Sequence, residues 1–169
     1  MRNSPSETGR LEAIWLKRSH RGPMDPFDSV RLVAGQGIAG SVDRSRRRQV
    51  TIISREAWLQ FMTTLGADAD PSSRRANLLV SGVRLTNTRG RVLRIGTARL
   101  LVGGELTPCE RMDEVRPGLS DLMRPDWGGG VFAQVLDDAE IQVGDIVEPD
   151  LAVAPQPGVT HQALGTIGA

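Results

Sequence analysis

"LLVGGELTPCERMDE", residues 100–114, contains the only cysteine of the chain, Cys109, and marks a junction between two kinds of structure. The apolar run before the two glycines is typical of a strand, whereas the polar residues after it are typical of a helix. Thr107 is predicted to cap that helix, with Pro108 at its first position and Glu110 completing a Thr-x-x-Glu capping box. Cys109 would then occupy the second helical position, where free backbone N–H groups and the helix dipole favour a thiolate.

Two interpretations of Cys109 follow from this local pattern. A thiolate can act as a nucleophile, carry a persulfide sulfur, or bind a soft transition metal. Alternatively, Cys109 is a small apolar side chain of the core, because free cysteine is among the residue types most often buried. The local sequence leaves both interpretations open.

Outward from this junction, most of the chain has the pattern of short strands. Apolar and polar residues alternate, or β-branched residues cluster, between stretches rich in glycine and proline. The predicted strands cover residues 10–18, 29–34, 48–54, 76–83, 91–95, 98–104, 130–136 and parts of 140–147. Residues 19–27 contain two prolines and a glycine and are predicted to be a loop.

One longer helix is predicted over residues 55–65, with Ser54 as its N-cap. Its apolar residues Trp58, Leu59 and Met62 are predicted to share one face, which Leu65 extends. Many short strands with about two helices favour an all-β barrel or sandwich with peripheral helices over an alternating β-α-β fold.

Composition and length narrow the class of protein. The 169 residues are expected to form one domain, residues 11–148, with a flexible extension at 1–10 and an irregular tail at 149–169. The net charge of +1 does not favour nucleic acid as a partner, and no apolar run reaches the roughly 20 residues that span a membrane. A single cysteine excludes a disulfide framework within the chain and a multi-cysteine zinc site, so a cytoplasmic location is expected.

The basic residues are almost all arginine, since Lys17 is the only lysine among the 21 lysines and arginines. Arginine is the better planar, bidentate partner for phosphate and carboxylate. Arg48 shares a strand face with Val50 and Ile52 and is predicted to point toward a barrel mouth. For Arg44 and Arg47, a solvated loop is the favoured interpretation. Asn77 could turn the chain before its strand, and glycines 128–130 could form a bend or let the backbone approach a ligand.

An ordered series of motifs resembles the MOSC (molybdenum cofactor sulfurase C-terminal) domain family over residues 11–148. The series is "RGPM", "GQGIAG", "RQVTIIS", "RANLLVSGV", "TPC", "GGGVFAQVL" and "VGDIV". The resemblance implies a mainly β fold: a mostly antiparallel MOSC-type β-barrel with a few peripheral helices. It also implies a cleft for molybdenum cofactor, a pterin that bears a phosphate and carries molybdenum.

The same resemblance names candidate site residues. Cys109 matches the family's cysteine that ligates molybdenum or is proposed to carry sulfur, so it is the candidate catalytic and metal-binding residue. Arg48 matches an arginine at a strand start, and Arg75 with Asn77 matches an Arg-x-Asn pair. The candidate cofactor-binding residues are Arg48, Arg75, Asn77, Thr107, Gly129 and Gly130.

The function implied is binding of molybdenum cofactor and reduction of N-hydroxylated small molecules. The chain has no flavin, haem or iron–sulfur motif, so a separate electron-donor protein would supply the electrons. One alternative is a persulfide carrier loaded by a sulfur-donor protein, and another is a cofactor-binding module without turnover. No nucleic acid or membrane is expected as a partner, and the labile cofactor can be lost on purification.

Overall fold

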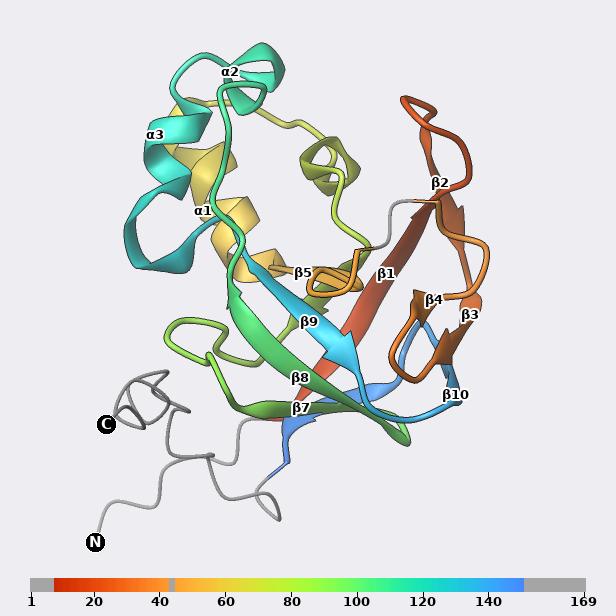
Figure 1. Cartoon of the computed structure of the whole chain (residues 1–169). Coiled ribbons are helices and arrows are strands. Elements are labelled where there is room, and N and C mark those ends of the chain that lie inside the picture. Colours follow the sequence, from red (N-terminus) through yellow and green to blue (C-terminus); the bar gives the residue numbers. More distant parts are fainter. Residues whose placement is uncertain (1–7, 43–44, 151–169) are drawn as a thin grey trace, which may run out of the picture.

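The strands close into a barrel in the computed structural model, which describes residues 8–42 and 45–150 (Figure 1). The barrel strands are β1 (Gly9–Lys17), β5 (Val50–Ser54), β6 (Leu78–Ser81), β7 (Val92–Ile95), β8 (Ala98–Glu105), β9 (Val131–Val135) and β11 (Ile146–Pro149). They pair in the order β11-β7-β8-β9-β5-β6-β1, and the pairing of β1 with β11 closes the ring. The predicted MOSC-type β-barrel with peripheral helices is therefore confirmed.

The barrel is mixed and not wholly antiparallel. β5 and β6 run parallel, with Ile52 opposite Leu78 in the register. Parallel neighbours need a crossover connection, which here contains the helix α1 (Arg55–Leu65) and the short 3-10 helix η1 (Pro71–Arg74). All other barrel pairs are antiparallel.

Residues 19–27, predicted to be a loop, end in a strand, β2 (Met24–Phe27), that pairs with β1. Pro26 is compatible with a strand here because β2 is an edge, so the missing N–H of proline faces no neighbouring strand. A second, small sheet has the order β10-β3-β4. Its strands are β3 (Ser29–Val33), β4 (Gly37–Ile38) and β10 (Ala139–Gln142).

Three clusters of buried apolar side chains hold the fold together, and the smallest of them contains Trp15, Ile53, Ala76 and Leu79. The barrel interior is filled from alternating strand positions, and residues such as Ile52, Leu78 and Leu100 are completely buried. The second cluster joins α1 to the short helices α2 (Met112–Val115) and α3 (Leu119–Met123). In Figure 1 these three helices gather beside one end of the barrel, with the β1–β2 hairpin on the other side of that end.

Helix α1 has the predicted bounds and the predicted cap, because the Ser54 hydroxyl accepts a hydrogen bond from the N–H of Ala57. Its buried face differs from the prediction. Trp58 and Met62 are buried, but Leu59 is 52% exposed. Leu65 packs against the cluster as predicted, and Phe61 does so in place of Leu59, since positions spaced by three and four residues share a helix face.

Met62→Ala and Leu59→Ala should therefore have very different effects on stability. We expect Met62→Ala to lower the free energy of unfolding by about 3 kcal/mol, because it opens a cavity in the helical cluster. Leu59→Ala, on the exposed face, should change it by less than about 0.5 kcal/mol. Urea unfolding of the two variants compares them directly, and equal losses would contradict this assignment of the buried face.

The barrel reaches slightly beyond the predicted domain limits. Gly9 and Arg10 pair with β11, and the N–H of Asp150 donates to the carbonyl oxygen of Val92. The predicted extension and tail otherwise fall at residues 1–7 and 151–169, which lie outside the described residues, as does Arg44. Within the described part of the chain, no helix is long and apolar enough to span a membrane.

Candidate functional site

Cys109 lies in an irregular segment between β8 and α2, and its side chain is exposed. The predicted helix start is wrong, because α2 begins only at Met112, with Arg111 as N-cap residue and no side-chain cap. The N–H of Leu106 still bonds the carbonyl oxygen of Gly130, so the chain stays extended past the end of β8. It turns only where the N–H of Met112 donates to the carbonyl oxygen of Cys109, at 3.0 Å. The exposed thiol also excludes the interpretation of Cys109 as a core residue.

The glycine loop 128–130 packs directly against this segment. A Cβ atom on Gly129 would lie 2.2 Å from the carbonyl oxygen of Leu106 and 3.0 Å from Pro108 Cδ. Gly130 has a φ of 96°, and a Cβ there would lie 2.3 Å from the carbonyl oxygen of Ile52. The loop therefore requires glycine at both positions, because the backbones approach too closely for any side chain.

Arg74 links the glycine loop to the segment that contains Cys109 through hydrogen bonds. Its guanidinium donates through Nε to the carbonyl oxygen of Gly129, at 3.2 Å, and through Nη2 to that of Leu106, at 3.1 Å. The side chain is buried. Burial lowers the pKa of Arg74 from its ordinary value, and the charge of the Cys109 thiolate opposes part of that shift. A buried cation thus lies within electrostatic reach of the thiol.

The next residue, Arg75, points the other way. It has a φ of 64°, in the left-handed region, and ends η1. Its exposed guanidinium donates through Nη2 to the carbonyl oxygen of Gly22, at 2.7 Å, and so bridges η1 to the β1–β2 turn.

Asn77, the second member of the predicted Arg-x-Asn pair, has a structural role in the barrel wall. Its side-chain oxygen accepts from the N–H and the hydroxyl of Thr51, and its amide nitrogen donates to the carbonyl oxygen of Trp15. The side chain is buried and ties β5 and β1 to the start of β6. These bonds occupy its oxygen and one N–H within the sheet.

An open pocket of about 660 Å³ lies between the β1–β2 turn, η1 and α2. Its lining residues are Lys17, Arg21, Ser73, Arg75, Arg111, Met112, Glu114 and Val115. Four cationic side chains against one carboxylate give this basic pocket a formal charge of +3. Cys109 does not line the pocket; it precedes the lining residue Arg111 by two positions in the chain.

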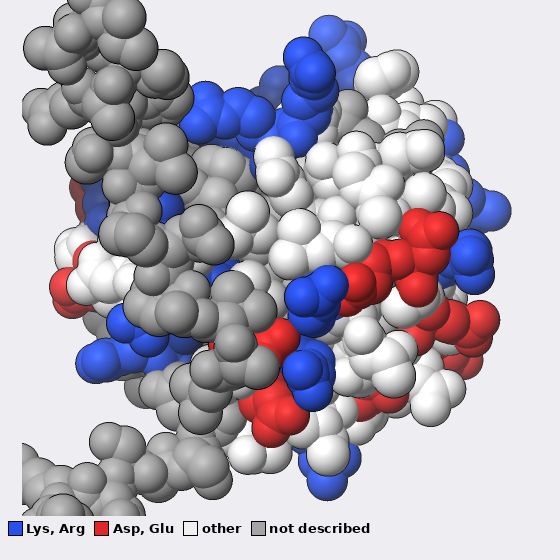
Figure 2. Space-filling model, turned by 60° about the horizontal axis from the view of Figure 1, so that its bottom comes forward, with Lys and Arg blue, Asp and Glu red and all other residues white. Residues whose placement is uncertain are grey.

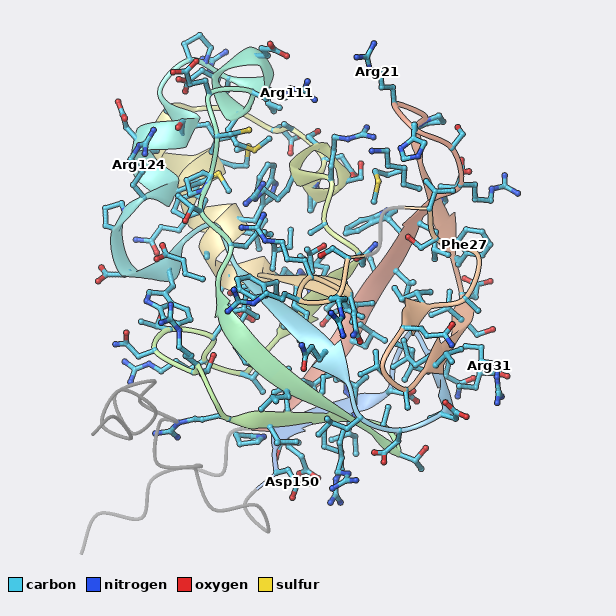
Figure 3. The ribbon with its side chains drawn as sticks, in the orientation of Figure 1. Arg21, Phe27, Arg31, Arg111, Arg124 and Asp150 are labelled. Carbon is cyan, nitrogen blue, oxygen red and sulfur yellow. The ribbon has the colours of Figure 1, made fainter. Side chains whose placement is uncertain are left out.

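The basic pocket opens at the helical end of the barrel. In Figure 3, Arg111 beside α2 and Arg21 at the tip of the β1–β2 hairpin both lie at that end, whereas Arg31 lies low on β3. The opposite end of the barrel carries both signs of charge. Figure 2 shows acidic and basic side chains interspersed on the part of that face that is not grey. The basic pocket, whose charge suits an anion, therefore lies at the end of the barrel where the segment with Cys109 leads into α2.

Comparison with known proteins identifies the family. The model of the MOSC domain matches residues 20–148, which is most of the chain. This chain belongs to the MOSC domain family. No curated protein matches it.

Solved structures show the same fold as this MOSC domain. The YuaD protein of Bacillus subtilis superposes with a TM-score of 0.71 and 22% identity, over 84% of this chain and 95% of that one. YiiM from Escherichia coli gives 0.64 and 18%, over 86% and 71% of the two chains. YiiM from Geobacillus stearothermophilus gives 0.67 and 17%, over 89% and 77%.

The structure of this MOSC domain brings some of the candidate residues together and separates others. Exposed Thr107 and buried Gly129 lie beside Cys109, and Arg75 reaches the basic pocket. Arg48 does not line that pocket. Its guanidinium lies over the ring of Phe132 instead, 5.2 Å from the ring centroid.

Three basic residues of this site were missed by sequence reasoning: Lys17, Arg21 and Arg111. A signal existed for each of them. Lys17 is the only lysine, Arg111 follows the only cysteine by two residues, and Arg21 begins the motif "RGPM".

Proposed function

We propose that this MOSC domain binds molybdenum cofactor, with the cofactor's phosphate in the basic pocket and Cys109 as a ligand of the molybdenum. The observation that carries the proposal is an exposed thiol two positions before Arg111, which lines a pocket with four cationic side chains. A phosphate dianion and a soft metal are the two chemical ends of this cofactor. Guanidinium forks suit the first, and a thiolate suits the second.

The pocket fits such a group in size and charge. Its volume of about 660 Å³ falls within the range of cofactor sites in proteins, and its formal charge is opposite to that of a phosphate. Two of its arginines, Arg21 and Arg75, have φ values of 59° and 64°. Left-handed backbone is unfavourable for such residues, by about 1 kcal/mol each, and such conformations cluster at functional sites.

The bound cofactor would supply the redox chemistry. Reduction of an N-hydroxylated compound to the amine consumes two electrons and two protons, and it releases the hydroxyl oxygen as water. The residues of the chain would bind the cofactor and position the thiol of Cys109. Arg75 and Arg111 hold the anion, whereas Arg74 and Gly129 hold the segment that presents Cys109. Electrons come from a separate protein.

A second candidate function is sulfur transfer. The exposure of Cys109 favours it, because a carrier thiol must be reachable by both the donor and the acceptor of the sulfur. In that case the protein would be isolated with a cyanide-labile sulfur on Cys109 and without stoichiometric molybdenum. The two candidates therefore differ in what the purified protein contains.

The double variant Arg75→Met/Arg111→Met tests the anion site. We expect it to bind inorganic pyrophosphate at least about 100-fold more weakly than the wild type, because two charge-assisted contacts are lost. Calorimetric titration at low salt measures this difference. Arg10→Met/Arg31→Met removes the same charge away from the pocket and is the matched control. Equal affinities in the two double variants would remove the anion site from the proposal.

A further inference from the structure

Phe132 forms an unusual platform on the outer face of β9. It lies opposite Gly104 in the β8–β9 register, next to an irregularity between Val102 and Gly104. Added Cβ atoms on Gly103 and Gly104 would lie 2.5 Å and 3.2 Å from its ring. The half-buried ring therefore packs directly against the backbone of the two glycines, and the guanidinium of Arg48 lies over the ring.

The loop that carries Arg48 is fastened to the barrel. The side-chain amides of Gln49 and Gln134 both donate to the carbonyl oxygen of Arg46, at 3.2 Å and 3.1 Å. Ser45 and Arg48 exchange two further hydrogen bonds, one of them through the Ser45 hydroxyl. These contacts hold the arginines 46–48 in place on the outer face of β9.

The arginines around this ring have exposed side chains, and no described carboxylate pairs with them. Arg46, Arg47 and Arg48 are exposed, as is Arg89, whose Nη2 lies 3.3 Å from the position of a Cβ on Gly104. Within residues 8–42 and 45–150, no carboxylate forms an ion pair with any of them. We refer to Arg46, Arg47, Arg48, Arg89 and Phe132 as the arginine platform.

The arginine platform lies close to Cys109. Five residues separate Gly104, under the Phe132 ring, from the cysteine. Because an extended chain advances at most about 3.6 Å per residue, the two backbone positions are no more than roughly 18 Å apart. A protein that covers the platform would therefore bind within roughly 18 Å of the backbone of Cys109.

We propose that the arginine platform is the docking surface for a small acidic electron-transfer protein, a flavin or iron–sulfur protein. This inference rests on the proposed function, which needs an external source of electrons. Arginines around one aromatic ring, none of them ion-paired within the described residues, match the composition of interface anchors, and complementary charge accelerates weak, transient docking. A nucleic acid fits less well, because the platform offers one ring for base stacking.

The experiment uses an acidic flavodoxin as the probe. Its association with the wild-type chain is compared with its association with Arg46→Glu/Arg47→Glu, in which Arg48 and Phe132 are retained. Arg10→Glu/Arg31→Glu carries the same change of charge away from the platform and is the control. At low salt we expect the association rate to fall at least tenfold in the first variant, to stay within about twofold in the control, and to fall in the wild type as salt is added.

Equal association of the two variants, or no flavodoxin binding by the wild type, would overturn the proposal. Tighter binding of a single-stranded oligonucleotide than of flavodoxin, lost in Arg46→Glu/Arg47→Glu, would also overturn it and assign the platform to nucleic acid. The molybdenum content of each protein is a separate readout. Absence of molybdenum from the wild type counts against the proposed function, whereas a wrong docking surface leaves the molybdenum content of all the proteins equal.

Discussion

Cys109→Ser is expected to abolish stoichiometric molybdenum binding in protein produced in a molybdenum-replete host. A serine hydroxyl is not ionised near neutral pH and is a hard ligand, whereas a thiolate is soft and matches the metal. The exposed side chain contributes little to packing, so the thermal midpoint should change by less than about 2 °C. Metal analysis of the purified protein, with thermal unfolding of the same samples, measures both effects.

Glu110→Gln provides the matched control for this experiment, because Glu110 is exposed on the same segment and has no sulfur. It should retain the molybdenum of the wild type. Molybdenum at the wild-type level in Cys109→Ser would contradict ligation by the thiol. Wild-type protein without molybdenum but with a cyanide-labile sulfur, absent from Cys109→Ser, would instead support the sulfur carrier.

Arg74→Met should be the most destabilising substitution among the arginines of this site. It removes both donors from the carbonyl oxygens of Gly129 and Leu106, and both hydrogen bonds are charge-assisted. We expect the free energy of unfolding to fall by about 3 kcal/mol, because each such bond to a buried group contributes roughly 1.5 kcal/mol or more. Chemical unfolding in urea, with its midpoint and slope, measures the loss.

Arg75→Met is the control, because it changes the same residue type one position later. Its one side-chain hydrogen bond, to Gly22, is exposed, so the loss of stability should not exceed about 1 kcal/mol. For anion binding we expect the reverse order. Arg75→Met should weaken pyrophosphate binding more than Arg74→Met, because Arg75 lines the basic pocket. Similar losses of stability in both variants would refute the distinct role assigned to Arg74.

The sequence predicted the elements whose signals are local. Helix α1 begins and ends as predicted because Ser54 caps it and Gly66 takes the left-handed conformation at its end. Most strands were located because alternating or β-branched residues pack into one barrel interior. β2 was missed because the two prolines and the glycine of residues 19–27 are typical of a loop. Leu59 was misplaced because neighbouring apolar residues do not share a helix face.

The predicted cap at "TPCE" shows where local reasoning fails. Thr107, Pro108 and Glu110 satisfy the pattern of a capping box, yet α2 begins only at Met112. Distant residues override the local preference. The carbonyl oxygen of Gly130 accepts a hydrogen bond from the N–H of Leu106, and Arg74 donates to the carbonyl oxygen of Leu106. A capping preference of about 1 kcal/mol cannot compete with these contacts.

The sequence by itself determined the β-barrel class, the helix α1, the family resemblance and the single cysteine as the residue to examine. Only the tertiary structure decided which basic residues surround that cysteine. Arg74 and Arg75 are the same residue type, but with the left-handed backbone at Arg75 the first side chain reaches the glycine loop and the second reaches the basic pocket. Hydrophobic periodicity is a property of neighbours in the chain, whereas the pocket joins residues from the β1–β2 turn, η1 and α2 that meet only when the barrel closes.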